Sequence, residues 1–188
     1  MKPNLTSKIV KMAACVLLVT GLGTATALAS CGDSFTAIAA RAKGVASTAG
    51  ASVASNPAGD GSSNNRTVVG MWYVQFLIGG QVIQEAYQIW NTGGTEVHNP
   101  NVDPRTSNIC LGAWDQDKPS GKYKLAHRVW SYDGNGTFLG TIHLSETVLV
   151  GPAGKTHWGS FTLDFYDPSG NFQNEVKGQV SAQRISPN

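Results

Sequence analysis

Two neighbouring segments of alternating hydropathy carry side chains able to bind a ligand or transfer a proton. Tyr123 and His127 lie four residues apart in the first segment, and Glu146 lies in the second. Because side chains of a strand alternate between its two faces, Tyr123 and His127 share one face. A neutral imidazole both donates and accepts hydrogen bonds, and a buried carboxyl can exchange a proton. This set therefore predicts either ligand orientation or general acid–base catalysis by His127, Glu146 and Tyr123.

Each of these residues also has a purely structural interpretation. Glu146 can form a buried ion pair with Arg184, because an interior carboxylate without a partner is costly. His127 can be a core histidine with satisfied hydrogen bonds, and Tyr123 is expected to hydrogen-bond Glu146. Cys110, expected near His127, is interpreted as a small core residue rather than a nucleophile.

Residues 67–188 show the period-two hydropathy of β-strands, interrupted by turns rich in Gly, Pro, Asp and Asn. An all-β fold of eight antiparallel strands is expected. Such a meander closes most economically into an up-and-down barrel, because closure removes the sheet edges. A two-sheet sandwich is the alternative. The expected strands cover residues 68–78, 81–90, 95–99, 108–114, 122–132, 137–150, 155–166 and 172–185.

Alternation also predicts which side chains face the interior of the barrel. The apolar pattern places Trp72 on the inner face, and the parity of the last strand places Arg184 on the same face. In the strand 81–90, Glu85 faces inward with one parity and Ala86 with the other, and the pattern leaves both open. The other expected inward residues are Val74, Phe76, Tyr123, Leu125, His127, Val129, Phe138, Ile142, Leu144, Glu146, Val148, Phe161, Leu163, Phe165, Val176, Val180 and Ala182.

The hairpin between the fifth and sixth strands predicts which residues lie opposite one another. Its short turn is expected to place Tyr123 opposite Glu146 and His127 opposite Ile142. This register gives an apolar mouth at one end of the barrel and a more polar floor at the other.

Composition and motifs exclude several classes of function. With 14 Lys and Arg against 12 Asp and Glu, the chain is not a strongly basic nucleic-acid binder, and its 3 Cys cannot form a disulfide scaffold. His143 and His157 are expected on the outer face, so they do not form a metal pair. Since phosphate-binding loops and hydrolase motifs are also absent from the sequence, we expect no metal, cofactor or nucleic acid.

Residues 1–30 have the features of a signal peptide. Three lysines precede an apolar stretch, and Ala27-Leu28-Ala29 is an A-x-A cleavage pattern. Residues 31–66 are rich in Ala, Ser and Gly, which is typical of a flexible tether. We therefore expect export of a barrel domain spanning residues 67–188, into the periplasm or beyond the cell.

Leu28-Ala29-Ser30-Cys31 resembles a bacterial lipobox, in which the cysteine becomes lipidated. Lipidated Cys31 would anchor the protein to a membrane. The alternatives are ordinary cleavage after Ala29 or Ser30, and a disulfide between Cys31 and Cys110.

Gly70-Met71-Trp72, at the start of the first strand, resembles the G-x-W motif of lipocalins and their calycin relatives. Arg184 resembles the arginine that packs across that tryptophan in these families. The resemblance covers these residues and the strand count, and no C-terminal helix is expected after the last strand. The resemblance implies that a small apolar molecule is bound inside the barrel, although some members of the superfamily are enzymes.

The favoured function is therefore that of an exported, lipocalin-like protein that holds a small apolar molecule. His127 and Tyr123 would orient that molecule. One alternative is a lyase or isomerase on the same barrel that uses His127 or Glu146 as acid and base, and another is a filled barrel that acts as a surface interaction module. The apolar walls of the expected site are Phe76, Phe138, Ile142, Phe161 and Phe165.

Overall fold

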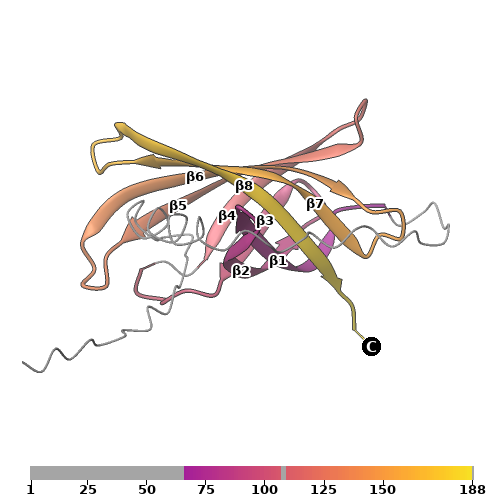
Figure 1. Ribbon diagram of the computed structural model, residues 1–188, viewed down its shortest axis with the longest axis horizontal. Coiled ribbons are helices and arrows are strands. Elements are labelled where there is room, and N and C mark those ends of the chain that lie inside the picture. The colour runs from indigo at the N-terminus through magenta and orange to yellow at the C-terminus, as the bar shows by residue number, and fades with distance from the viewer. Residues whose placement is uncertain (1–65, 107–108, 188) are drawn as a thin grey trace, which may run out of the picture.

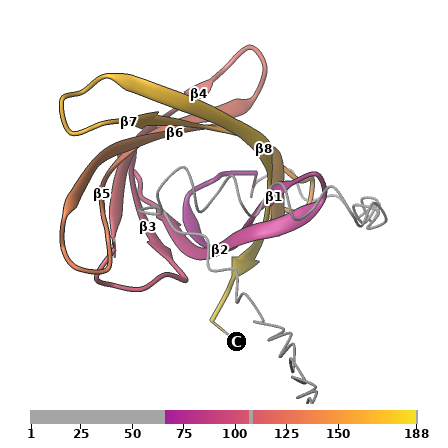
Figure 2. The ribbon, with the colours of Figure 1, turned by 60° about the vertical axis from the view of Figure 1, so that its left-hand side comes forward.

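The computed structural model describes residues 66–106 and 109–187. The expected signal peptide, Cys31 and all but the last residue of the expected tether lie outside the described residues. Eight antiparallel strands pair in sequence order, and the last pairs with the first, so the sheet closes into an up-and-down barrel (Figures 1 and 2). The strands are β1 (Gly70–Ile78), β2 (Gln81–Trp90), β3 (Thr95–Pro100), β4 (Cys110–Asp117), β5 (Lys122–Tyr132), β6 (Phe138–Val150), β7 (Thr156–Tyr166) and β8 (Phe172–Ile185).

This architecture confirms the expected fold class. Most consecutive strands are joined by short turns, with a longer loop between β3 and β4, and glycines with positive φ occupy several of the turns, including Gly79 and Gly80 between β1 and β2. Within the two described ranges, no helix has the length and apolar character needed to cross a membrane.

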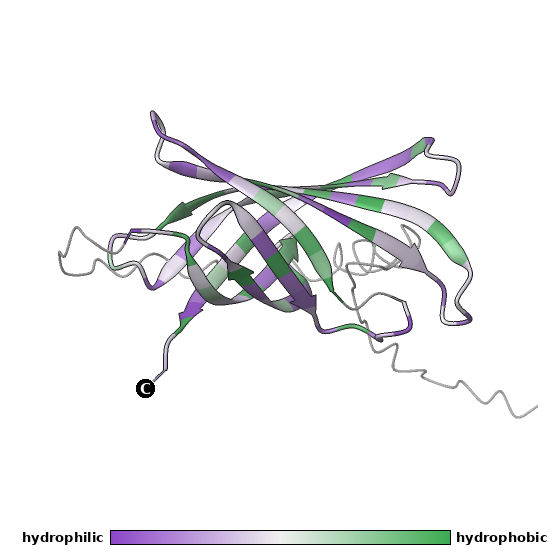
Figure 3. Ribbon diagram, turned by 180° about the vertical axis from the view of Figure 1, so that it is seen from behind, coloured by the Kyte–Doolittle hydropathy of each residue, from purple (hydrophilic) through white to green (hydrophobic). Residues whose placement is uncertain are grey.

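Period-two hydropathy produces a largely apolar interior and a more polar outer face. In β5 every second side chain from Tyr123 to Val129 is buried, and the intervening ones are exposed. Figure 3 shows this alternation as bands of opposite hydropathy along the strands. Most of the expected inward residues are buried, and half-buried Val176 packs against them. The confirmed buried set is Trp72, Val74, Phe76, Tyr123, Leu125, His127, Val129, Ile142, Leu144, Glu146, Val148, Phe161, Leu163, Phe165, Val180 and Ala182.

The parity of β2, which the sequence left open, follows the even-numbered residues from Gln84 onward, whereas before an irregularity in the pairing with β1 Ile83 is buried and Val82 is exposed. Gln84, Ala86, Gln88 and Trp90 are buried, whereas the side chain of Tyr87 is 53% exposed. Two glutamines therefore face the interior of the barrel, where they can serve as hydrogen-bond partners for other buried polar groups.

The expected register of the β5–β6 hairpin was wrong by two residues. Tyr123 lies opposite Val148, and His127 lies opposite Leu144. The register shifts between Ser131 and Tyr132, so an additional residue is accommodated near the turn. A slip of two residues preserves parity, and the inward residues of β6 beyond the shift were therefore assigned to the correct face.

Phe138 lies before that irregularity, and its expected inward position was wrong. Its side chain is 38% exposed. The ring instead packs against Tyr132 on the outer face, with 5.5 Å between the ring centroids. Phe138 is thus separated from the apolar residues inside the barrel.

Arg184 covers one end of the barrel, as its resemblance to the calycin arginine implied. Its guanidinium carbon lies 4.1 Å from the centroid of the Trp72 ring. The same group donates hydrogen bonds to the carbonyl oxygens of Gly154 at 2.5 Å, Val69 at 2.7 Å and Thr67 at 2.5 Å. Arg184, near the end of β8, therefore links the β6–β7 turn to the segment entering β1.

Replacing Arg184 with Lys is expected to destabilise the barrel by about 1–3 kcal/mol, because an ammonium cannot serve three carbonyls in a plane while stacking on Trp72. Urea denaturation measures the change. Arg128→Lys is the matched control, since Arg128 is exposed and donates one hydrogen bond to a backbone carbonyl. Equal stabilities of the two variants would contradict the role given to Arg184.

Candidate functional site

One row of inward positions across three strands brings Glu96 and His127 together. In the sheet register Glu96 of β3 lies opposite Gly112 of β4, and Gly112 lies opposite His127 of β5. A β-carbon at Gly112 would lie only 2.7 Å from Oε2 of Glu96. The missing side chain of Gly112 therefore gives the carboxylate room to approach the imidazole. Oε2 of Glu96 lies 3.3 Å from Nδ1 of His127.

His98 completes a cluster with this pair. It follows Glu96 by two residues on β3, so both side chains point to the same face. Nδ1 of His98 lies 3.9 Å from Oε1 of Glu96, and the His98 and His127 rings are 5.2 Å apart between centroids. The ring of Phe76 packs edge-on against His98. We call Glu96, His98 and His127 the central triad.

The central triad is unusual because its side chains are polar and yet almost completely buried. Glu96, His98 and His127 are each at most 1% exposed. Both carboxylate oxygens of Glu96 and both ring nitrogens of His98 have no hydrogen-bond partner among the described residues. A buried polar atom without a partner costs about 1–3 kcal/mol of stability. Several such atoms in one place therefore indicate a site built to hold something polar.

Glu146 and Gln88 form a second polar pair inside the barrel. Nε2 of Gln88 donates a hydrogen bond to Oε1 of Glu146 at 3.2 Å, and Oε1 of Gln88 accepts one from Trp90 at 2.9 Å. The expected Glu146–Arg184 ion pair was wrong, because Arg184 binds backbone carbonyls instead.

The expected contact between Tyr123 and Glu146 was also wrong. The Tyr123 hydroxyl donates a hydrogen bond to the backbone oxygen of Arg66 at 3.1 Å. Tyr123 therefore lies at the end of the barrel where β5 begins, beside the segment that leads into β1.

Burial and neighbouring charges determine which of the titratable side chains in the interior are charged. Burial opposes the charge of His127, but the neighbouring Cys110 thiol and the Glu96 carboxylate, which lies within ion-pair distance, outweigh it and raise the pKa of His127 to about 10. Burial lowers the pKa of His98 well below its usual value, and the positive charge of His127 adds to this effect. Burial, together with repulsion from Glu96, raises the pKa of Glu146 to about 8. At neutral pH His127 is therefore cationic, whereas His98 and Glu146 are neutral.

Sequence reasoning found His127, Glu146 and the proximity of Cys110, but it missed Glu96 and His98. Cys110 is buried in the core, as expected, with its thiol beside the His127 imidazole. The available signal was the spacing Glu-x-His in a strand, which places both side chains on one face. The signal was weak because β3 contains Val97 on the opposite parity, so hydropathy alone favoured the other face.

His157 lies inside the barrel, so its expected outward position was wrong. It shares the parity of Phe161 on β7 and is fully buried. Its ring packs edge-on against Trp72, with centroids 4.6 Å apart, and against Trp90 at 6.2 Å. Burial and the nearby positive charge of Arg184 lower its pKa to about 3. His143, in contrast, is on the outer face as expected, where it packs against Tyr166.

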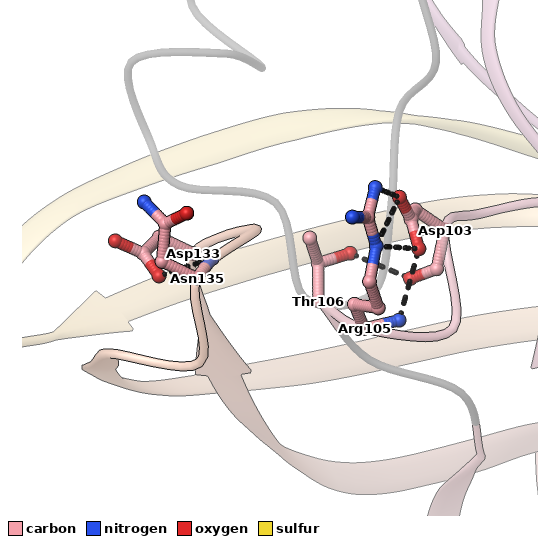
Figure 4. A network of polar contacts seen from close by, with 5 residues as sticks. All are labelled: Asp103, Arg105, Thr106, Asp133 and Asn135. Carbon is pink, nitrogen blue, oxygen red and sulfur yellow. Dashed lines mark hydrogen bonds and ion pairs between the residues drawn. The ribbon is translucent and has the colours of Figure 1, made fainter.

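A groove of about 450 Å³ lies at the other end of the barrel, between the β3–β4 loop and the β5–β6 hairpin. Figure 4 shows both borders: Arg105 pairs with Asp103 in the loop, and Asp133 and Asn135 form the hairpin turn. Val129 lines the groove and also belongs to the buried core. The groove residues are Pro104, Arg105, Thr106, Ile109, Val129, Trp130, Tyr132 and Gly136.

The expected ligand-contacting residues occupy three different places. Phe138 is on the outer face and Tyr123 is at the end where β1 begins, as described above. Phe76 and Phe161 pack edge-on in the interior, with ring centroids 5.2 Å apart. Ile142, Phe165 and His127 are also buried inside the barrel. Their contact with a ligand remains a prediction.

Replacing Gly112 with Ala is expected to destabilise the barrel by about 1–3 kcal/mol, because the added methyl group meets Glu96 Oε2 and Leu125 Cδ1, each at 2.7 Å. Urea denaturation at neutral pH measures this loss. Gly134→Ala is the control, since a β-carbon there meets nothing within 4 Å. If the Gly112→Ala protein were as stable as the wild type, Glu96 would not need the space left by the missing side chain of Gly112.

Replacing His157 with Phe is expected to flatten the dependence of stability on pH. The pKa of His157 is about 3 in the folded state and 6.5 in the unfolded chain. Below pH 6.5 only the unfolded state takes up the proton, so the wild type loses about 2 kcal/mol by pH 5. A phenyl ring has no proton to bind, so the variant avoids this loss.

Urea denaturation at pH 7, 6 and 5 tests the difference between His157→Phe and the wild type. His143→Gln, which removes a histidine from the outer face, is the control and is expected to keep most of the wild-type loss. A His157→Phe barrel that loses stability as steeply as the wild type would contradict the neutral, buried state of His157.

Comparison with protein-family models, curated proteins and solved structures finds no match to this chain. The resemblance to calycins therefore rests on Gly70-Met71-Trp72, on Arg184 and on the closed eight-stranded barrel. Of these features, the structure contains the closed barrel and the packing of Arg184 on Trp72.

Proposed function

We propose that this chain is an exported barrel protein that binds a small, mainly apolar molecule bearing a polar group. The observation that carries this proposal is the position of Val129. Val129 is one of the residues that line the groove, it belongs to the buried core, and the next inward residue of β5 is His127 of the central triad. An apolar entrance thus adjoins a buried polar centre.

The groove has the properties of a small-molecule site. Its volume of about 450 Å³ is within the range of about 300–1,000 Å³ typical of such sites. Ile109, Trp130 and Tyr132 supply apolar and aromatic surface, and Arg105 lies at the border. Trp130 is 68% exposed, so a bound molecule would gain contact with an aromatic ring that now faces water.

The resemblance to calycins supports the same proposal, because it implies a molecule held within the barrel. The N-terminal pattern supports export, and the lipobox-like sequence ending at Cys31 supports attachment to a membrane through a lipid. Lipocalin-like binding, export and lipidation are all parts of the proposal.

An acid–base enzyme, acting as a lyase or isomerase, is the second candidate function. The specific observation in its favour is that Glu146 is not held by Arg184. Its raised pKa of about 8 leaves a proton on the carboxyl group at neutral pH. Glu146 would then donate that proton and His127 would stabilise developing negative charge.

Replacing Trp130 with Ala is expected to weaken ligand binding without unfolding the barrel, because the side chain lines the groove and is mostly exposed. The probe is 1-anilinonaphthalene-8-sulfonate, which has an apolar body and an anionic group, and its fluorescence measures saturable binding. We expect a loss of affinity of about 10-fold, as for removal of one aromatic anchor. Trp158→Ala is the control, since Trp158 lies at the start of β7, outside the groove.

Equal affinity of the Trp130→Ala and Trp158→Ala proteins for the probe would contradict the groove as the binding site. Native mass spectrometry of the protein purified from its own host identifies a natural ligand directly. A mass matching the bare chain in every preparation, together with unsaturable probe binding, would favour the filled barrel acting as an interaction module.

A further inference from the structure

The central triad has the composition of a transition-metal site. It offers one carboxylate and two imidazoles, and one ligand atom from each residue lies within 4.8 Å of the other two. Two nitrogens and one oxygen suit zinc and neighbouring divalent metals, whereas calcium and magnesium prefer oxygen ligands alone. The donor set therefore selects the class of ion.

The distances also fit a shared ion. Two ligand atoms that each lie about 2.1 Å from one tetrahedral ion are about 3.4 Å apart. Glu96 Oε2 and His127 Nδ1 are separated by 3.3 Å, and Glu96 Oε1 and His98 Nδ1 by 3.9 Å. Small side-chain rotations would bring all three donors to an ion between them.

An ion would account for the unpartnered atoms of the triad. Both oxygens of Glu96 and both nitrogens of His98 are fully buried without hydrogen-bond partners among the described residues. Phe76 packs against His98 and excludes water from one side of the ring. Cys110, whose thiol hydrogen-bonds His127, holds the imidazole in place in the manner of an outer-shell partner.

We propose that Glu96, His98 and His127 bind one divalent transition-metal ion of the zinc class inside the barrel, and that the ion displaces to solvent the proton that His127 carries without it. Gly112 is a positioning residue for this site, because its missing side chain lets Glu96 reach His127 across β4. Three protein ligands leave a coordination position open, as in catalytic zinc sites. The site does not depend on the proposed small-molecule function.

Calorimetric titration of the chelator-treated, purified protein with Zn²⁺ tests this proposal. We expect one ion per chain and a rise in the melting temperature when Zn²⁺ is added. Loss of an outer-shell partner weakens metal binding about 10- to 100-fold, so loss of a ligand in His98→Phe should weaken it by about 100-fold or more. The substituted residue retains an aromatic ring against Phe76, which favours folding of this variant.

His157→Phe is the matched control, since it removes another fully buried histidine from the same barrel, and it is expected to bind Zn²⁺ as the wild type does. If His98→Phe fails to fold, Glu96→Gln replaces it, because the amide keeps the shape of the carboxylate while removing its charge. Gly112→Ala retains all three ligands and is expected to lose affinity by about 10-fold or more through displacement of Glu96.

The proposal is overturned if the folded wild-type protein binds no Zn²⁺, which would indicate that water alone solvates the triad. It is also overturned if His98→Phe, or its substitute Glu96→Gln, binds Zn²⁺ as tightly as the wild type, since the ion would then bind elsewhere on the chain. Failure of the fluorescent probe to bind would leave these results unchanged, so the two proposals fail separately.

Discussion

The interior of a closed eight-stranded sheet is narrow, with room for its own side chains or for one small ligand among them, and this limit governs the rest of the structure. Most inward residues are removed from bulk water, whatever their chemistry. Glu96, His98, His127 and Glu146 are each at most 2% exposed. Their charges and hydrogen bonds must therefore be satisfied within the barrel, by one another or by something bound there.

The two ends of the barrel meet this limit differently. At the end where β1 begins, Arg184 covers Trp72, and His157 fills the space between Trp72 and Trp90 as a neutral ring. This end is closed by packing and by hydrogen bonds from Arg184 to backbone carbonyls. At the other end, the β3–β4 loop and the β5–β6 hairpin leave the groove over Val129. Binding is therefore expected from the groove end.

The fold could be predicted because alternation and turn residues are local signals repeated along the whole domain. The candidate site could be predicted only in part, because its geometry depends on register between strands distant in sequence. Tyr132 pairs with Phe138 rather than with Thr137, a change of one residue at the turn that placed Phe138 on the outer face, and the irregularity between Ser131 and Tyr132 adds the second residue of the shift. Glu96 meets His127 only through Gly112 on the intervening strand, a relation that no periodicity within β3 or β5 reveals.

Gly112 shows how a barrel can hold a polar site without opening its sheet. Adjacent strands are about 4.8 Å apart, so side chains on next-nearest strands face each other across about 10 Å with a third residue between them. A side chain at that third position would fill the space, and at Gly112 it would collide with Glu96. Along β5 the next inward residue toward the groove is Val129, about 7 Å from His127. The groove therefore lies one inward position along β5 from the central triad, although the triad itself is buried and does not line the groove.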